Sequence, residues 1–251
     1  MPTVAELSAP YGNFLLGPRR GPGVCETCFD LTGGPPRCHH CARADRALDA
    51  VVPISYSVAH EQLHHALAGY KRPPVVVAAR FELELAAVLW RYLASHENCV
   101  ASAAGTTAFE LVTTVPSSTR ARDATHPLHR IVGELVEPTR TRFERVLRRS
   151  DVSIPPRTVS AEKFACTRQL ENRSVLLIDD TWTTGANVRS AAASLKQAGA
   201  SSVAAVIIGR HLHRHWGHND RGLSALPAPF DWNDCARHGT RGARMPTTQG
   251  L

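Results

Sequence analysis

This 251-residue sequence lacks the signs of a membrane-spanning helix, of a secretory signal peptide and of a disulfide framework. Each absence excludes a class of protein. No stretch approaches the run of about eighteen apolar residues that a membrane-spanning helix requires. The opening residues 1–8 lack the charged start and apolar core of a secretory signal peptide. The seven cysteines are an odd number, which argues against a framework of disulfides. We therefore expect a cytoplasmic protein with no membrane partner.

Acidic residues are also scarce relative to basic ones. There are 22 aspartates and glutamates against 29 lysines and arginines, so the formal net charge is +7, and most of the excess is arginine. Arginine suits bidentate contacts to phosphate, which fits a polyphosphate ligand or a nucleic acid. A solvated basic face explains any single arginine equally well, so the charge does not choose among these alternatives.

The composition changes along the chain and predicts three regions. Residues 1–50 are rich in glycine and proline and can bury little apolar surface alone, so we expect a small module held by a metal. Residues 51–215 contain the main α/β domain, and their first part, 51–98, is predicted as a helical lead-in because Leu85, Leu89 and Leu93 share one helix face. Residues 216–251 are weakly patterned and are expected to form an irregular, partly disordered tail.

Short apolar runs alternate with helical segments in the main domain, a pattern typical of a parallel sheet. The predicted strands are 110–115, 174–179 and 202–208, with a further short strand at 143–147. The predicted helices are 127–136 and 186–198. The polar segment 148–172 is long enough to suggest a mobile loop.

The turn after the strand at 174–179 carries the most specific motif, Asp179-Asp180-Thr181-Trp182-Thr183-Thr184-Gly185. The strand ends in two acids, and a Thr/Gly turn then leads into a helix. This loop therefore lies at the carboxyl edge of the sheet, where ligands bind. The backbone N–H groups at the start of the helix form an anion site, which the helix dipole reinforces. Asp179 and Asp180 have the chemistry to accept hydrogen bonds from the vicinal hydroxyls of a sugar. The loop is therefore predicted to bind a ribose 5-phosphate, although a strand turn that only caps a helix is the alternative.

This motif resembles the phosphoribosyl pyrophosphate (PRPP) motif of type I phosphoribosyltransferases, in which hydrophobics and two acids precede Thr-Thr-Gly. The resemblance implies that Asp179 and Asp180, the catalytic candidates, contact the ribose hydroxyls. It implies that the 5-phosphate is surrounded by Thr181, Trp182, Thr183, Thr184, Gly185, Ala186 and Asn187. Thr183 stands where purine-salvage members carry an acid, which disfavours that activity.

Two close cysteine pairs, Cys25-x2-Cys28 and Cys38-x2-Cys41, lie in the first region. Four soft ligands in two knuckles match the tetrahedral shell of structural Zn²⁺. His39 and His40 are alternative or supporting ligands, and an iron–sulfur cluster is the less favoured alternative. Four free thiols in a flexible arm would be the interpretation without a metal.

The order of zinc knuckles, helical segment and PRPP loop resembles the ComF family of competence-associated phosphoribosyltransferase-like proteins. Further matching stretches are Leu67-Ala-Gly-Tyr-Lys71, 112–118 and 120–128, so the resemblance covers residues 25–210. It implies an α/β fold with a type I phosphoribosyltransferase core and a small N-terminal zinc-binding module. It also suggests single-stranded nucleic acid as a partner.

A transferase also needs cations and donors for the departing pyrophosphate. The candidates follow the strand at 110–115 and are Ser117, Ser118, Arg120 and Arg122; a strand-to-helix turn with solvated arginines is the alternative. Lys163 and Arg168 are the cationic candidates in the segment 148–172, if it closes over the site as a lid. We interpret Tyr70 and Lys71 as a core tyrosine beside a surface lysine. The alternative is that their side chains extend into the PRPP site.

These observations predict a protein that binds PRPP with Mg²⁺ and transfers the phosphoribosyl group to an unidentified nitrogenous acceptor. The oxygens of the substrate would provide most of the ligands of the Mg²⁺ ion. A non-catalytic sensor of PRPP or nucleotides is the second hypothesis. A factor associated with single-stranded DNA is the third.

Overall fold

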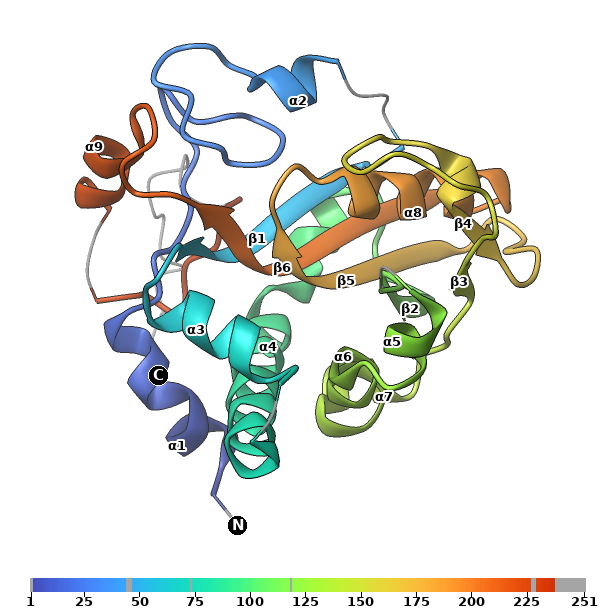
Figure 1. The fold of residues 1–251 in the computed structure, drawn as a ribbon, viewed down its shortest axis with the longest axis horizontal. Coiled ribbons are helices and arrows are strands. Elements are labelled where there is room, and N and C mark those ends of the chain that lie inside the picture. The colour runs from blue at the N-terminus through green and yellow to red at the C-terminus, as the bar shows by residue number, and fades with distance from the viewer. Residues whose placement is uncertain (1, 44–46, 73, 118, 227–228, 238–251) are drawn as a thin grey trace, which may run out of the picture.

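A four-stranded parallel sheet forms the centre of the protein (Figure 1). The structure is a computed structural model that describes residues 2–43, 47–72, 74–117, 119–226 and 229–237. The strand order is β1-β6-β5-β2. The strands span β1 Ala50–Val58, β2 Leu111–Thr114, β5 Ser174–Trp182 and β6 Ser202–Leu212. The parallel sheet predicted from the alternating pattern is confirmed.

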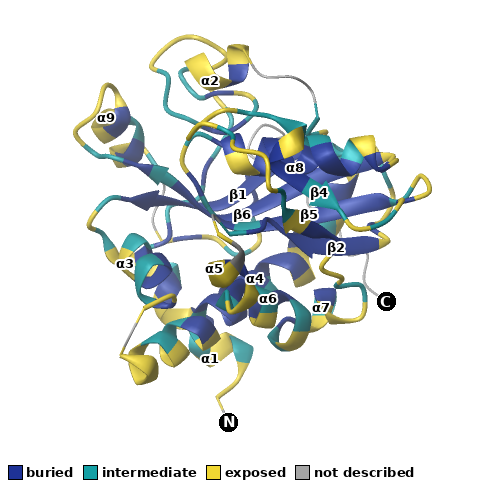
Figure 2. Cartoon of the chain, turned by 45° about the vertical axis from the view of Figure 1, so that its right-hand side comes forward, coloured by how far each residue is buried: buried dark blue, intermediate teal, exposed yellow. Residues whose placement is uncertain are grey.

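Helices cover both faces of the sheet, which explains why its strands are near-continuous apolar runs. On one face α3 (Gln62–Gly69) and α4 (Val75–Ala103) pack against β1 and β6, and they share a buried cluster with Leu176 and Ile178 of β5. On the other face α8 (Ala186–Gln197) packs against Val175 and Leu177. Figure 2 shows the strands buried between these layers. The α/β class is therefore confirmed.

Shorter elements complete the chain around this core. The remaining helices are α1 (Val4–Ser8), α2 (His39–Ala42), α5 (Arg120–Ala124), α6 (Pro127–Arg130), α7 (Glu137–Arg140) and α9 (Asn219–Ser224). Single turns of other helix types occur at Ala9–Asn13, Ile131–Leu135 and Ala161–Lys163. Two short strands, β3 (Leu147–Arg149) and β4 (Phe164–Cys166), form an antiparallel pair.

The predicted helical lead-in at 51–98 is wrong at its start, because residues 50–58 form strand β1. Pro53 and the alternation of Ser55 and Ser57 obscured this strand in the sequence. β1 is an edge strand of the four-stranded sheet, where a proline that lacks an N–H group is tolerated. Its outer side carries a single antiparallel bridge, from Tyr56 to Leu16. The rest of the lead-in is helical, as α3 and α4.

The segment 148–172, predicted as a mobile loop, instead packs against α8. The Ser160 N–H donates to Ser190 Oγ at 3.0 Å, and Ser194 Oγ donates to the Phe164 carbonyl at 3.1 Å. β3 begins only at Leu147, so the strand predicted at 143–147 is displaced, and Phe143 forms a single parallel bridge to Val112.

The cysteine module and the C-terminal segment each join a different buried cluster of the core. The four paired cysteines are buried in the cluster that contains α8. Phe230, Cys235 and Ala236 are buried with α4, so the tail predicted as irregular contributes to the core and also contains α9. The disorder expected at the very end falls on 238–251, which lie outside the described residues. Among the described residues, no helix has the length and apolar character to cross a membrane.

Candidate functional site

A cavity of about 290 Å³ opens at the carboxyl end of β5, around the loop that leads into α8. It is lined by residues of the predicted loop and by one residue from a distant segment. The lining residues are Arg157, Asp179, Thr181, Thr183, Thr184, Gly185, Ala186, Asn187 and Val188. The predicted ribose-phosphate loop therefore surrounds one cavity at the start of a twelve-residue helix.

The loop turns sharply because of Gly185, which has a φ of +78°. A Cβ atom at this position would lie 2.0 Å from the ring of Trp182, so both the backbone angle and the space require glycine. The Trp182 ring is only 1% exposed and packs beneath the loop, with the Arg189 guanidinium 5.1 Å from its centroid. Trp182 therefore shapes the loop from below and does not line the cavity.

The two aspartates lie on opposite sides of β5, because successive side chains of a strand alternate. Asp179 lines the cavity together with Thr181 and Thr183. Asp180 is buried on the side of α3, where it accepts a hydrogen bond from the Tyr70 hydroxyl and forms an ion pair with Lys71 Nζ. The cavity thus presents one of the two predicted carboxylates, and the other is engaged by protein groups.

The pKa values of the two carboxyl groups are displaced in opposite directions. Burial, and then the neighbouring Asp180, raise the pKa of Asp179 well above its ordinary value. Burial acts against Asp180 too, but the Lys71 cation and the Tyr70 hydroxyl outweigh it and lower its pKa. The site therefore holds a stable anion at Asp180 beside a carboxyl group at Asp179 that retains its proton more readily.

Tyr70 and Lys71 are functional candidates that the sequence interpretation placed outside the site. Tyr70 is buried, as expected, but its hydroxyl points to Asp180, and Lys71 is a partner of the same carboxylate. His126 lies beside them, with its ring 6.0 Å from that of Tyr70, and burial lowers its pKa to about 4. The only signal in the sequence was the stretch Leu67–Lys71, which matched the family resemblance.

The basic residue of the segment 148–172 that reaches the cavity is Arg157, which the sequence did not single out. It adopts a φ of +64°, unusual for a residue with a side chain. Lys163 is buried and donates to the Thr158 carbonyl at 3.5 Å, while Arg168 pairs with Glu144 at 2.6 Å. Neither predicted lid cation lines the cavity, and Lys163 instead braces the segment that presents Arg157.

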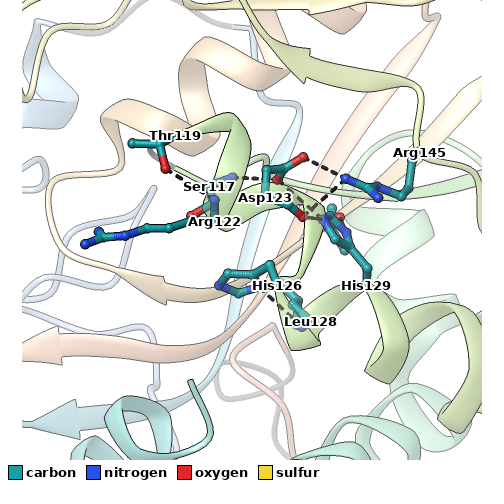
Figure 3. Close-up of polar contacts among 9 residues, drawn as sticks. Ser117, Thr119, Arg122, Asp123, His126, Leu128, His129 and Arg145 are labelled. Carbon is teal, nitrogen blue, oxygen red and sulfur yellow. Dashed lines mark hydrogen bonds and ion pairs between the residues drawn. The ribbon is translucent and has the colours of Figure 1, made fainter. Parts of the chain in front are cut away.

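The second predicted loop follows β2 and reaches the same edge of the sheet. β2 pairs in parallel with β5, and its last residue, Thr114, lies opposite Ile178, so the chain leaves β2 beside the point where β5 reaches Asp179. Asp123 organises the turn: it accepts hydrogen bonds from the Ser117 N–H and from Arg145, each at 2.8 Å (Figure 3). The loop after β2 therefore has a shape set by a buried carboxylate.

His129 joins Asp123 to the strand. Its Nε2 lies 3.0 Å from the Asp123 carbonyl, which can only accept, so Nε2 carries the proton and Nδ1 accepts from Thr114 Oγ1 at 2.8 Å. Burial, and then Arg145, lower the pKa of His129, which favours this neutral form. The spacing of Thr114, Asp123 and His129 in the sequence does not indicate that they form a hydrogen-bond network.

The predicted pyrophosphate residues are near the edge of the sheet but do not line the β5 cavity. The Ser117 backbone is held by Asp123, and the exposed Arg122 side chain extends away from that carboxylate (Figure 3). Arg120 begins α5, and its side chain is not among the described parts. Ser118 lies outside the described residues.

The four cysteines of the predicted zinc module come together. The sulfur atoms of Cys25, Cys28, Cys38 and Cys41 all lie within 4.8 Å of one another, and all four residues are buried. Four thiols at these separations fit a tetrahedral structural Zn²⁺ site. The two histidines inside the second pair, His39 and His40, are not part of this cluster.

Arg189 connects the cysteine cluster to the loop of the cavity. Its guanidinium donates to Cys41 Sγ at 2.8 Å and to the carbonyl oxygens of His40 and Thr184, each at 3.3 Å. A second cavity of about 390 Å³ lies between the two parts and shares Arg157, Thr184 and Ala186 with the first. Its lining is basic, since His39, His40, Arg43 and Arg189 also contribute. The cysteine module is therefore a structural neighbour of the site.

No protein-family model matches the sequence, and no curated protein matches it either. The function is consequently inferred from the residues that line the cavity and from the contacts around Asp180.

Proposed function

We propose that the chain is a phosphoribosyltransferase-like protein that binds PRPP with Mg²⁺, or another ribose 5-phosphate ligand, in the β5–α8 cavity. The single observation that carries this proposal is the lining of that cavity: a carboxylate, three threonine residues and the glycine turn at the start of α8 surround one space. The proposal includes a type I phosphoribosyltransferase core and a relationship to the ComF family. The sequence order of knuckles, helical segment and loop supports that relationship.

The 5-phosphate would lie at the start of α8, where the first N–H groups of a helix have no partner within the helix. The hydroxyls of Thr183 and Thr184 add donors, and Arg157 supplies a cation on the opposite wall. Asp179 would accept hydrogen bonds from the ribose hydroxyls. Asp180 would act through Tyr70 and Lys71, which fix the end of the strand, and is a positioning residue in this arrangement.

In the transfer reaction a nitrogen nucleophile attacks the anomeric carbon of PRPP. The bond between that carbon and the pyrophosphate oxygen breaks, pyrophosphate leaves with the electron pair, and the nucleophile loses its proton. Mg²⁺ bound to the phosphate oxygens would neutralise the leaving charge. The Ser117 turn and the arginines of α5 are the candidates to receive pyrophosphate, and the protein contributes orientation and electrostatic stabilisation.

Two other functions are each favoured by a particular observation. The predicted lid cations are engaged elsewhere, Lys163 with a backbone carbonyl and Arg168 with Glu144, which favours a sensor that binds PRPP without turnover. The basic cavity beside the cysteine module favours an association with single-stranded DNA through its phosphates.

Calorimetry with PRPP and Mg²⁺, followed by assays of pyrophosphate release with a panel of nucleobases and amines, separates these functions. Binding with release supports the transferase, and binding without release supports the sensor. Failure of PRPP and of ribose 5-phosphate to bind at millimolar concentration contradicts the ribose-phosphate proposal. Salt-dependent binding to a single-stranded oligonucleotide supports the third function.

Arg157 provides a sharper arm of the same experiment. We expect Arg157→Ala to weaken PRPP binding about tenfold, since a charge-assisted hydrogen bond to phosphate contributes roughly 1.5 kcal/mol. The matched control is Arg148→Ala, an exposed arginine of the same segment that does not line the cavity. Equal affinities of the two variants for PRPP would show that Arg157 does not contribute to PRPP binding.

A further inference from the structure

A second group of metal-binding side chains lies far from the cysteine module, where α4 meets the C-terminal segment. His96 and Cys99 belong to α4, and Cys235 belongs to the segment 229–237. One ligand atom from each lies within 4.8 Å of the other two. His96 is 2% exposed and Cys235 is 5% exposed, while Cys99 is half-buried, so the group lies at the edge of the core.

The placement of these residues matches what a metal site requires. His96 and Cys99 are three residues apart in a helix, so they share one face. His96 Nε2 lies 2.8 Å from the Trp232 carbonyl, which accepts only, so Nε2 carries the proton and Nδ1 holds a lone pair. A histidine that ligates a metal commonly donates its other N–H to a carbonyl in this way, which fixes the ring and raises its basicity.

We propose that His96, Cys99 and Cys235 form a second metal site, for Zn²⁺ or another divalent ion that prefers thiolate ligands. Two sulfurs and one imidazole nitrogen are soft and intermediate ligands that suit Zn²⁺ and disfavour Mg²⁺ or Ca²⁺. Binding displaces the protons of the two thiols to solvent. The site differs from the cysteine cluster in joining two segments that are distant in the sequence.

Three protein ligands leave a fourth tetrahedral position. A water molecule can fill this position, as it does at other zinc sites with three protein ligands.

The surroundings indicate what the metal would do. The C-terminal segment already contacts the core through the Phe230 N–H, which donates to the Gly12 carbonyl at 3.0 Å, and through Trp232, whose ring lies 4.3 Å from the Arg91 guanidinium. Tyr92 packs against the His96 ring at 4.8 Å. A metal bound by Cys235 would fasten this segment to α4 and stabilise the packing between them.

The metal content of the full-length protein, purified with reductant and measured by elemental analysis, tests this proposal. We expect two metal ions per chain, one for each ligand group. The double variant Cys99→Ser/Cys235→Ser should hold one, and Cys166→Ser, a thiol outside both groups, should still hold two.

A measurement on the unmodified chain guards against variants that fail to fold. Replacement of the metal with Co²⁺ should give thiolate-to-cobalt charge-transfer absorption for two ions per chain, and the intensity should fall to that of the cysteine cluster in the double variant. One ion per wild-type chain overturns the proposal. Recovery of Cys99 and Cys235 as a disulfide under reducing conditions overturns it as well.

Discussion

The two loops at the carboxyl edge of the sheet are built in different ways. The loop after β5 takes its shape from its own residues, since Gly185 turns over the ring of Trp182 only three positions away. The loop after β2 takes its shape from partners further along the chain, because Asp123 holds Ser117 and is itself held by Arg145 and His129. The first loop surrounds a cavity, and the second borders the same edge without lining it.

This difference indicates which part of a binding site is encoded locally. A loop whose geometry depends on one left-handed glycine and a neighbouring ring can be recognised as a short motif. A loop whose geometry depends on an ion pair with a distant residue cannot, because nothing in the spacing of Asp123 and Arg145 indicates that they meet. The predictions below disturb one loop at a time, beginning with the largest expected effect.

Replacing Gly185 with alanine should have the largest effect. The new Cβ would meet the Trp182 ring at 2.0 Å and would require a φ that alanine avoids. We expect a loss of about 3 kcal/mol in the free energy of unfolding, measured by denaturant titration, and a loss of ribose-phosphate binding of at least about 100-fold by calorimetry.

The matched control for this change is Gly105→Ala. Gly105 has a similar φ of +72°, but open space surrounds the position of its Cβ. This variant should lose only about 1 kcal/mol and keep its affinity. Equal destabilisation by both variants would show that the contact with Trp182 has no role.

Removal of metal from the cysteine cluster should disturb the loop after β5 and leave the loop after β2 unchanged. Arg189 links Cys41 to the Thr184 carbonyl, so loss of the cluster releases the loop from one side. We expect Cys25→Ser to weaken ribose-phosphate binding at least about tenfold, because such a site contributes several kcal/mol to folding. Calorimetry measures the affinity, and the amide signals of Ser117 and Asp123 in NMR spectra report on the second loop.

Cys166→Ser is the control for that experiment, since it removes a thiol that belongs to neither group of metal-binding side chains. An affinity that is unchanged in Cys25→Ser would contradict a structural role of the module in the site.

Asp123→Ala should disturb the second loop alone. Asp123 is only 7% exposed. Its carboxylate accepts a hydrogen bond from the Ser117 N–H and pairs with Arg145, and the substitution removes both contacts. We expect a loss of about 2 kcal/mol in stability, together with slower pyrophosphate release at unchanged affinity for ribose 5-phosphate. Asp220→Ala, which removes an exposed aspartate paired with Arg214, should be close to neutral. A large loss of ribose 5-phosphate affinity in Asp123→Ala would show that the loops are not independent.

The smallest effect concerns pH. Burial lowers the pKa of His126 from 6.5 to about 4, so between these values the unfolded chain binds a proton that the folded chain does not. The contribution is fully present above pH 6.5 and is lost as the pH falls toward 4. We expect the wild-type chain to lose more stability than His126→Asn over this window, as measured by urea titration at several pH values. Parallel curves for the two proteins would contradict the assignment.

The sequence predicted the parts of the molecule that depend on near neighbours. The parallel sheet, helix α8, the loop around Gly185 and the four clustered cysteines all follow from local pattern and spacing. Strand β1 was missed because it is an edge strand that contains Pro53. Tyr70, Lys71 and Arg157 could not be found by spacing, since each reaches the site through tertiary packing from another segment. For the same reason the sequence pointed to Lys163 and did not single out Arg157: Lys163 is buried, whereas Arg157 of the same segment lines the cavity.

The most direct test of the central claim is an NMR titration of the ¹⁵N-labelled protein with ribose 5-phosphate. The account predicts chemical-shift changes in the amides of residues 183–187 and in Asp179, and predicts that Asp179→Asn weakens them while the fold persists. Saturation at millimolar concentration without any change in these amides, or changes confined to other surfaces, would contradict it.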